Sequence, residues 1–440
     1  MEPLKFVATL VFGLVAAGAY TRRWRAFERR AALLCVLTHG FSGIAQEFVY
    51  RVVYERGGDM ILYQKYGEIL ARYMSYAGSE GIQSIFALLF QLSPEPLPFY
   101  VQGAGSSTGS MCAVSALISY FWSNELYVMG AGIGVASGFG SMFIYGTIRN
   151  SIPPEWLPRV STFALLLPSV VFWTSALLKE AVIMFGIGLT TLGVKYVVVD
   201  RRWVFGAAIA LLGATPIFLL KTYVLAGMFA GAPLAWFVAR EVRNKRVIHV
   251  SATRAIVLGV LALVFVVGFG EVFDTYNVSE LGAELAHEQA NTLRAAGAST
   301  YQLVDPSATS LAGQFVYAPL ALLTTFFRPL LFEVHNVMSL VNSIESTAIL
   351  VLFLVAIRRT GIPDFARYLM TKPMLLFLAV YAMIIAVGVG LATTNLGALS
   401  RYRAPMYGQL AILFAVWSLI GTKRRLPMPG GPSAPRNVTP

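Results

Sequence analysis

Charged side chains are scarce in this chain of 440 residues. Asp, Glu, Lys and Arg make up 13% of the sequence, whereas hydrophobic residues make up 57%. In soluble domains, charged residues make up about a quarter of the sequence. Several apolar runs also reach the length that spans a bilayer, where every backbone N–H and C=O must be paired within the segment. The shortage of charge therefore excludes a soluble fold and predicts an all-α, polytopic transmembrane helical bundle.

Cysteine and histidine are also rare. Cys35 and Cys112 lie in apolar stretches without metal-ligand spacing, which is typical of packing residues. The four histidines form no cluster along the chain. An internal repeat, the signature of many transporters, is absent as well. The sequence therefore gives no sign of a His/Cys metal centre.

Apolar runs separated by charged breaks predict about 11 membrane spans. The expected spans lie near residues 4–20, 31–50, 126–147, 160–176, 180–199, 203–220, 222–239, 255–272, 337–357, 374–393 and 404–421. Two further apolar stretches, 107–122 and 311–327, fit either spans or re-entrant or interfacial helices. The first span ends in VAAGAY, which resembles a signal-peptide cleavage site, but the five arginines that follow favour an uncleaved span.

The net charge of +12 is segregated by loop, which excludes a nucleic-acid-binding protein. Six segments hold 22 of the 34 basic residues and only five acidic ones: 21–30, 148–159, 200–202, 240–254, 358–372 and the tail from Gly421. All six fall on one side of the membrane if 107–122 does not cross it. The positive-inside bias then makes that side cytoplasmic and the N-terminus external.

This orientation divides the chain into a membrane domain and a tail. The membrane domain covers 1–422, with two long extracytoplasmic loops at about 51–125 and 273–336 that we expect to contain interfacial helices. The segment 423–440 is rich in Pro and Gly, which predicts a disordered cytoplasmic tail.

Ionised side chains at membrane depth are costly and often functional, and five groups of them mark the outer ends of the expected spans. The first is RGGDMILYQKYGEIL at 56–70. Asp59 begins a helical pattern there, with Tyr63 and Tyr66 on about one face. Asp59 either N-caps this helix or acts as a functional carboxylate.

The second and third groups interrupt long apolar runs. Pro168, Trp173 and the charged pair Lys179–Glu180 interrupt what would otherwise be about 40 apolar residues. They form either a tight hairpin with its Trp in the aromatic belt or a site, and the cost of the charges favours a site. Lys221 is the only charge between two adjoining spans, and either snorkels to the interface or belongs to the same site.

The fourth and fifth groups come from the second half of the chain. In 326–346 lie Arg328, Glu333, His335, Asn336 and Glu345. Arg328 and Glu333 could pair with each other, which leaves Glu345 unexplained within the apolar zone. The outer hairpin at 393–408 contains Asn395, Arg401 and Arg403. Arginines on the outer side run against the positive-inside bias. Their presence there favours a bound anion as their partner.

Together these groups predict one outer face with phosphate-handling chemistry. Arg binds phosphate oxygens in a planar fork, and a neighbouring carboxylate can accept a proton from an attacking hydroxyl. Transfer of a sugar from a lipid pyrophosphate needs both functions.

Five stretches occur in the order GGDMILYQKYG, PSVVFWTSALLKE, KTY, FRPLLFEVHN and TTNLGALSRYR. They resemble the multispan glycosyltransferase-like proteins encoded with bacterial polysaccharide clusters, which are similar to GT-C glycosyltransferases and O-antigen-polymerase-type enzymes. The resemblance covers about residues 40–420 and rests on short motifs. It implies a GT-C-like bundle in the bacterial inner membrane, with an extracytoplasmic active site.

The resemblance also implies partners and roles. The donor would be a sugar or oligosaccharide on polyprenyl (undecaprenyl) phosphate, and the acceptor a glycan or a lipid-linked sugar, among membrane lipids. Asp59 matches the base in the first outer loop, and Glu180 matches a second carboxylate that supports the acceptor or a divalent cation, Mg²⁺ or Mn²⁺. Glu333 is the third catalytic candidate. The expected substrate- and phosphate-binding residues are Lys179, Lys221, Arg328, His335, Asn336, Asn395, Arg401, Arg403, Tyr63, Tyr66 and Trp173.

The sequence departs from the family pattern at two positions. Asp59 has no neighbouring acid, and Lys221 stands where the family pattern predicts an arginine.

The sequence does not separate a single-sugar glycosyltransferase from a polymerase or ligase. A lipid-linked-glycan flippase or other transporter would instead place charges at several depths of a central cavity. The nearly uncharged middle of most expected spans favours the outer-face enzyme.

Overall fold

The computed structural model describes residues 1–53, 58–92, 97–244, 286–287, 289–290, 300–305 and 310–420. Regular secondary structure within these residues is helical, and the extended pairing found there is an isolated antiparallel bridge between Thr300 and Asn395. The all-α prediction is therefore confirmed for the described part of the chain.

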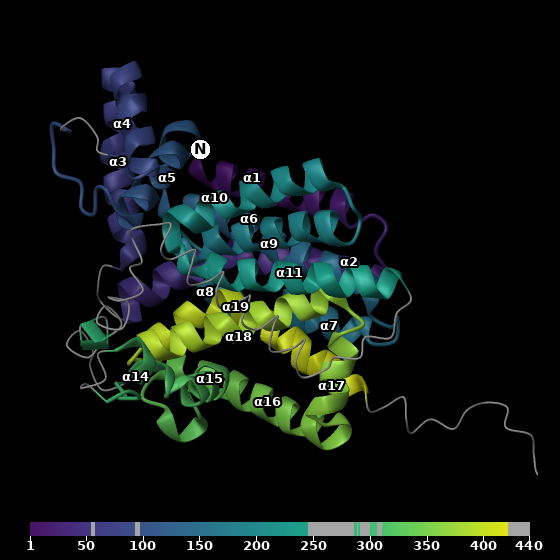
Figure 1. Cartoon of the computed structure of the whole chain (residues 1–440). Coiled ribbons are helices and arrows are strands. Elements are labelled where there is room, and N and C mark those ends of the chain that lie inside the picture. The colour runs from purple at the N-terminus through teal and green to yellow at the C-terminus, as the bar shows by residue number, and fades with distance from the viewer. Residues whose placement is uncertain are drawn as a thin grey trace, which may run out of the picture.

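Nine of the described helices are long and apolar enough to cross a bilayer. They are α1 (Glu2–Tyr20), α2 (Ala26–Phe48), α6 (Leu126–Ile148), α9 (Lys179–Val198), α10 (Trp203–Lys221), α11 (Tyr223–Arg243), α16 (Val337–Thr360), α18 (Pro373–Ala392) and α19 (Leu396–Ile420). Figure 1 shows most of them aligned along a common direction, as expected for a membrane bundle. Each coincides with an expected span, so the polytopic membrane class is confirmed.

Four expected segments differ from the structure or lie outside the residues that it describes. The stretch 160–176 forms two short helices, α7 (Leu157–Leu165) and α8 (Pro168–Trp173), rather than one continuous span. Pro168 lacks a backbone N–H and forces the residue before it out of the helical region, and Leu167 is accordingly extended. Helix α19 begins at Leu396, so Arg401 and Arg403 lie in a helix and not in a hairpin loop. The expected span 255–272 and the tail 423–440 lie outside the described residues.

The first long loop folds into three helices. They are α3 (Asp59–Ala77), α4 (Ser79–Leu89) and α5 (Ser107–Phe121), which pack on one another. A helix of 15 residues rises only about 22 Å, less than the hydrocarbon thickness, so α5 is too short to cross. Figure 1 shows α3 and α4 running across the direction of the long helices, at one end of the bundle. This arrangement agrees with the interfacial reading of 107–122.

The stretch 311–327 is also divided into short helices. Helix α14 (Leu311–Phe315) and helix α15 (Ala318–Phe327) flank the break at Tyr317, and α15 packs against α18. A 3₁₀ turn over Leu331–Glu333 then leads into α16.

Close packing fixes helix α9 between two neighbours. A Cβ added at Gly188 would lie 2.4 Å from the Cα of Gly140 in α6, and one added at Gly193 would lie 2.4 Å from the backbone nitrogen of Ala210 in α10. Only glycine allows backbones to approach so closely, as is common where membrane helices meet. Helix α9 is therefore held firmly, and so is its first residue pair, Lys179–Glu180.

The basic segments meet at the end of the bundle opposite this pair. Buried Glu28 receives two hydrogen bonds of 2.9 Å from Arg149 and one of 2.6 Å from the hydroxyl of Tyr145. The indole N–H of Trp417 in α19 donates to the carbonyl of Gly361, at 3.2 Å. Segment 21–30 therefore lies beside segment 148–159. Segment 358–372 likewise lies beside the end of α19, as the segregation of charge by loop predicts.

Candidate functional site

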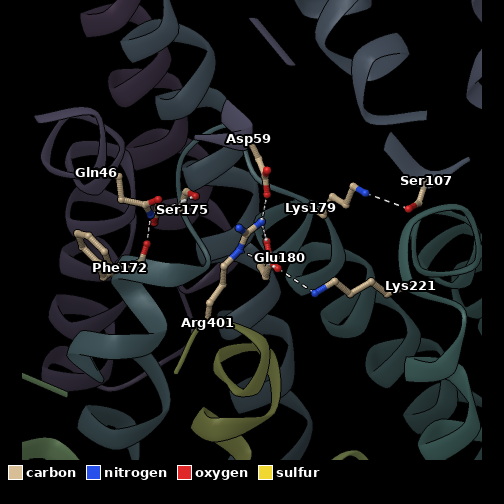
Figure 2. Close-up of polar contacts among 9 residues, drawn as sticks. All are labelled: Gln46, Asp59, Ser107, Phe172, Ser175, Lys179, Glu180, Lys221 and Arg401. Carbon is tan, nitrogen blue, oxygen red and sulfur yellow. Dashed lines mark hydrogen bonds and ion pairs between the residues drawn. The ribbon is translucent and has the colours of Figure 1, made fainter. Parts of the chain in front are cut away.

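Four ionised side chains from four helices form one connected charge network, defined as Asp59, Glu180, Lys221 and Arg401 (Figure 2). The Glu180 carboxylate lies 2.8 Å from the Lys221 ammonium and 3.0 Å from Nε of Arg401. Nη2 of Arg401 lies 3.1 Å from the other Glu180 oxygen and 2.8 Å from Oδ2 of Asp59. Arg401 therefore joins the two carboxylates.

Local structure explains why these residues meet. Glu180 is the second residue of α9 and Lys221 is the last residue of α10, so these antiparallel neighbours place the two side chains at the same end. Arg401 lies in the second turn of α19. The start of α19 is capped by Asn395, whose side-chain oxygen accepts from the backbone N–H groups of Gly397 and Ala398, at 2.7 and 3.1 Å.

Asp59 is the first residue of α3, and the N-cap is Gly58. The reading of Asp59 as the N-cap is therefore wrong. A carboxylate in the first turn still interacts favourably with the helix dipole, but its direct partner is Arg401.

Exposure of the network is graded. The Glu180 side chain is fully buried, those of Lys221 and Arg401 are 13% and 17% exposed, and that of Asp59 is 49% exposed. A buried carboxylate is tolerated only when cations and hydrogen bonds compensate it, and Glu180 has two cations. Asp59 is thus the member of the network that a substrate can reach.

Lys179, which precedes Glu180, lies beside the network rather than in it. Its ammonium donates to the hydroxyls of Ser107 and Thr108, at 2.9 and 3.1 Å, and Figure 2 shows its side chain directed away from Glu180 toward Ser107. The ring of Tyr63 lies 6.0 Å from the ammonium. Sequence reasoning missed Ser107 and Thr108, because hydroxyl residues in a small-residue stretch carry no distinctive pattern.

The aromatic candidates separate into different environments. Tyr63 is buried, and its burial together with the nearby Asp59 raises the pKa of its phenol, which stays protonated. Tyr66 is half-buried and packs against the core. Trp173 is buried, which contradicts a place in the aromatic belt, and its indole N–H has no hydrogen-bond partner among the described residues. Tyr402, which sequence reasoning missed, lies 4.2 Å from the Lys221 ammonium.

Arg328 and Glu333 form a pair of their own. Nε of Arg328 donates to Glu333 at 2.7 Å, and the ring of Tyr301 covers the guanidinium at 4.3 Å. Burial raises the pKa of the Glu333 carboxyl, but hydrogen bonds from Arg328 and the backbone N–H of Leu330 outweigh it, so the pKa lies below its ordinary value. The alternative in which these residues pair is confirmed, and Glu333 is a weak candidate for the base.

Arg403 is directed elsewhere. It is fully buried and donates to the backbone carbonyls of Thr325, at 3.0 Å, and Arg328, and to the hydroxyl of Ser346, at 2.8 Å. These contacts tie α19 to α16 and to the end of α15. The donors of Arg403 therefore serve the bundle's interior rather than the charge network.

The remaining polar candidates belong to helix α16 or directly precede it. The side chain of Asn336 caps it by accepting from the backbone N–H of Ser339, at 2.8 Å. His335 is exposed, and its backbone N–H donates to the Ser339 hydroxyl. Glu345, unexplained by the sequence, accepts from the backbone N–H of Ser169 at 2.8 Å and from the Ser169 hydroxyl.

The donor set fits a divalent cation poorly. Among the described residues no group of three or more His, Cys, Asp or Glu side chains gathers. The two carboxylates of the network, Asp59 and Glu180, share the Arg401 guanidinium, which occupies the position between them. We therefore derive no step through Mg²⁺ or Mn²⁺.

Comparison of the chain with family models, with curated proteins and with solved structures finds no match. The class that the fold defines is a polytopic α-helical membrane protein with a buried ion network at one end of its bundle.

Proposed function

We propose that this protein is an integral-membrane glycosyltransferase or repeat-unit polymerase of bacterial cell-envelope or exopolysaccharide synthesis. It takes sugar from a polyprenyl-phosphate-linked donor at the extracytoplasmic face of the inner membrane, within a GT-C-like bundle. One observation carries the proposal: the half-exposed carboxylate of Asp59 lies against Arg401, in a network with Lys221 at one end of the bundle. This arrangement supports an acid–base step beside cations.

Asp59 is the best-placed base of the three carboxylate candidates. Both oxygens of Glu180 contact cations and the side chain is fully buried, so Glu180 is a positioning residue. Glu333 is tied to Arg328, and its pKa is lowered. Asp59 contacts Arg401 through Oδ2 and remains half exposed.

The proposed reaction is transfer of the donor sugar to an acceptor hydroxyl, with Asp59 as the base. The acceptor hydroxyl oxygen bonds to the anomeric carbon of the donor sugar while its proton passes to Asp59. The bond from that carbon to the phosphate oxygen breaks, and its electron pair stays on the lipid phosphate. Cations near the departing phosphate stabilise the developing charge.

The test is deletion of the gene in the bacterium that makes the protein, followed by mass spectrometry of its polyprenyl-linked glycans. We expect one lipid-linked sugar or oligosaccharide to accumulate and its glycan product to disappear, and the Asp59→Asn variant to reproduce both effects. The Glu47→Gln variant is the control, since Glu47 pairs with Arg51 outside the network. An unchanged lipid-linked pool after deletion would refute the function.

A further inference from the structure

Lys179 carries a positive charge that its surroundings do not balance. The charge network has two carboxylates and two cations, which offset each other. Lys179 lies next to it with no carboxylate within ion-pair distance in the described part of the chain, and its partners are two neutral hydroxyls. A partly buried ammonium without a counterion is costly. An anion from outside the chain would remove that cost.

A surface hollow lies in the chain segment just before Ser107 and Thr108. It has a volume of about 330 Å³ and is lined by Leu97, Phe99, Tyr100, Val101, Gly103 and Ala104. Its lining is mainly apolar, with two aromatic rings. It belongs to the segment between α4 and α5, at the end of the bundle where α3 and α4 run crosswise (Figure 1).

Gly103 connects the hollow to the Lys179 contacts. A Cβ added at Gly103 would lie 2.6 Å from Cβ of Thr108, so a residue that lines the hollow packs directly against one that contacts Lys179. Gly103 also has a φ of +74°, and its carbonyl accepts from the Ser106 hydroxyl at 2.7 Å. An added side chain is excluded there on both grounds. The hollow and the Lys179 ammonium are therefore neighbours, joined through the contact between Gly103 and Thr108.

We propose that Lys179, Ser107 and Thr108 bind the phosphate of a polyprenyl phosphate, and that the hollow takes its first isoprene units. An ammonium with hydroxyls beside it suits phosphate oxygens, as a point charge with extra donors. The apolar lining suits a prenyl chain better than a sugar. The identity of the lipid rests on the proposed function, whereas the phosphate subsite rests on the contacts of Lys179. Asp59 and the phosphate subsite then serve opposite partners of the reaction, the acceptor and the leaving group.

The test is direct binding, independent of catalysis. The full-length protein in phosphatidylcholine nanodiscs is titrated with radiolabelled decaprenyl phosphate. We expect Lys179→Met to weaken binding by about tenfold or more, because a charge-assisted contact is lost. The double variant Ser107→Ala/Thr108→Val should weaken it less, since it leaves the charge in place. Lys195→Met and Thr38→Val are matched controls: Lys195 pairs with Asp200 at the other end of α9, and the Thr38 hydroxyl bonds its own helix.

Competition separates the sources of phosphate. The Ala104→Trp variant, at an exposed position, fills the hollow. It should weaken the binding of decaprenyl phosphate and leave the weak competition by inorganic phosphate unchanged. Excess phosphatidylglycerol should not compete. Wild-type affinity in a folded Lys179→Met variant would overturn the phosphate subsite. Equal competition by phosphatidylglycerol would overturn the polyprenyl assignment.

The subsite and the function can fail separately. Lys179-dependent binding together with an unchanged glycan pool in the deletion strain would support the subsite and refute the function. Loss of the glycan product on deletion, with normal binding and transfer by Lys179→Met, would support the function and overturn the subsite.

Discussion

Glu180 holds the charge network together, because its carboxylate contacts both Lys221 and Arg401 while fully buried. Glu180→Gln would leave two mostly buried cations without their shared counterion. Removing one partner of a buried ion pair typically costs about 3–5 kcal/mol. We expect a loss of stability in that range, measured by thermal unfolding of the purified protein in detergent.

Two variants check the cause of that loss. Glu68→Gln removes an exposed ion pair with Arg72 and should cost less than about 1 kcal/mol. The double variant Glu180→Gln/Lys221→Met should be more stable than Glu180→Gln alone, since one stranded charge is removed with its partner. A double variant no better than the single one would contradict a network held by charge.

Asp59 gives a prediction about rate rather than stability. Asp59→Asn retains the shape of the side chain and a hydrogen bond to Arg401, but removes the basic oxygen. General base catalysis contributes about 10²–10⁴-fold, so product formation should fall by that factor. The measurement is the initial rate of transfer from lipid-linked donor extracted from the deletion strain.

The control for Asp59 is the unfolding temperature of the same variant, which should change little because Asp59 is half exposed. An Asn variant with wild-type rate would remove Asp59 from the chemistry. A variant that unfolds much earlier would instead assign it a structural role.

The sequence predicted part of this site well. The cost of burying charge singled out Asp59, Glu180, Lys221 and Arg401, and all four meet. The sequence could not show which candidates belong to one network, because that depends on contacts between helix ends that are far apart in the chain. The Arg328–Glu333 pair, five residues apart, could still be offered as an alternative. Nothing local separated Arg403, which donates to the backbone carbonyl of Thr325, far along the chain.

At the scale of elements, Glu345 explains how the broken segment α7–α8 is held. The proline break frees the backbone N–H of Ser169, and the Glu345 carboxylate from α16 accepts from it at 2.8 Å. Glu345→Ala should cost about 1–3 kcal/mol, the usual penalty for a buried donor left unpaired. Thermal unfolding measures it, with Ser75→Ala as the control, whose hydroxyl bonds only its own helix. An unfolding temperature equal to wild type would show that water replaces the carboxylate.

Long apolar runs made the continuous helices predictable, because hydrophobicity over a span outweighs local detail. Breaks were less predictable. Pro168 stands within an apolar run long enough to read as one span, and only its backbone effect divides the segment. Helix α19 starts eight residues before the expected span, since Ser400 and Arg403, polar residues that mark a loop in the sequence, are buried against neighbouring helices.

The whole molecule has two unlike ends. The charge network and α3–α5 lie at one end, and the buried Glu28–Arg149 pair and α17 (Ile362–Leu369) lie at the other. In intact cells we expect an impermeant maleimide to label Ser79→Cys, at the exposed turn between α3 and α4, but not Thr371→Cys, at the exposed turn after α17. The native thiols Cys35 and Cys112 are buried and should not interfere. The reverse labelling pattern would place the network on the cytoplasmic side and refute the proposed location of the reaction.

The Lys221–Glu180 pair also bears on how the chain enters the bilayer. Its two residues belong to consecutive helices, so the buried Lys221 charge already has its counterion within the α9–α10 hairpin and can enter the lipid as a neutral pair. Arg401 is synthesised 180 residues after Lys221 and joins last, once α19 is in place. Completion of the network thus waits for the synthesis and insertion of α19. A truncated chain that lacks α19 would retain an inserted hairpin but no assembled site.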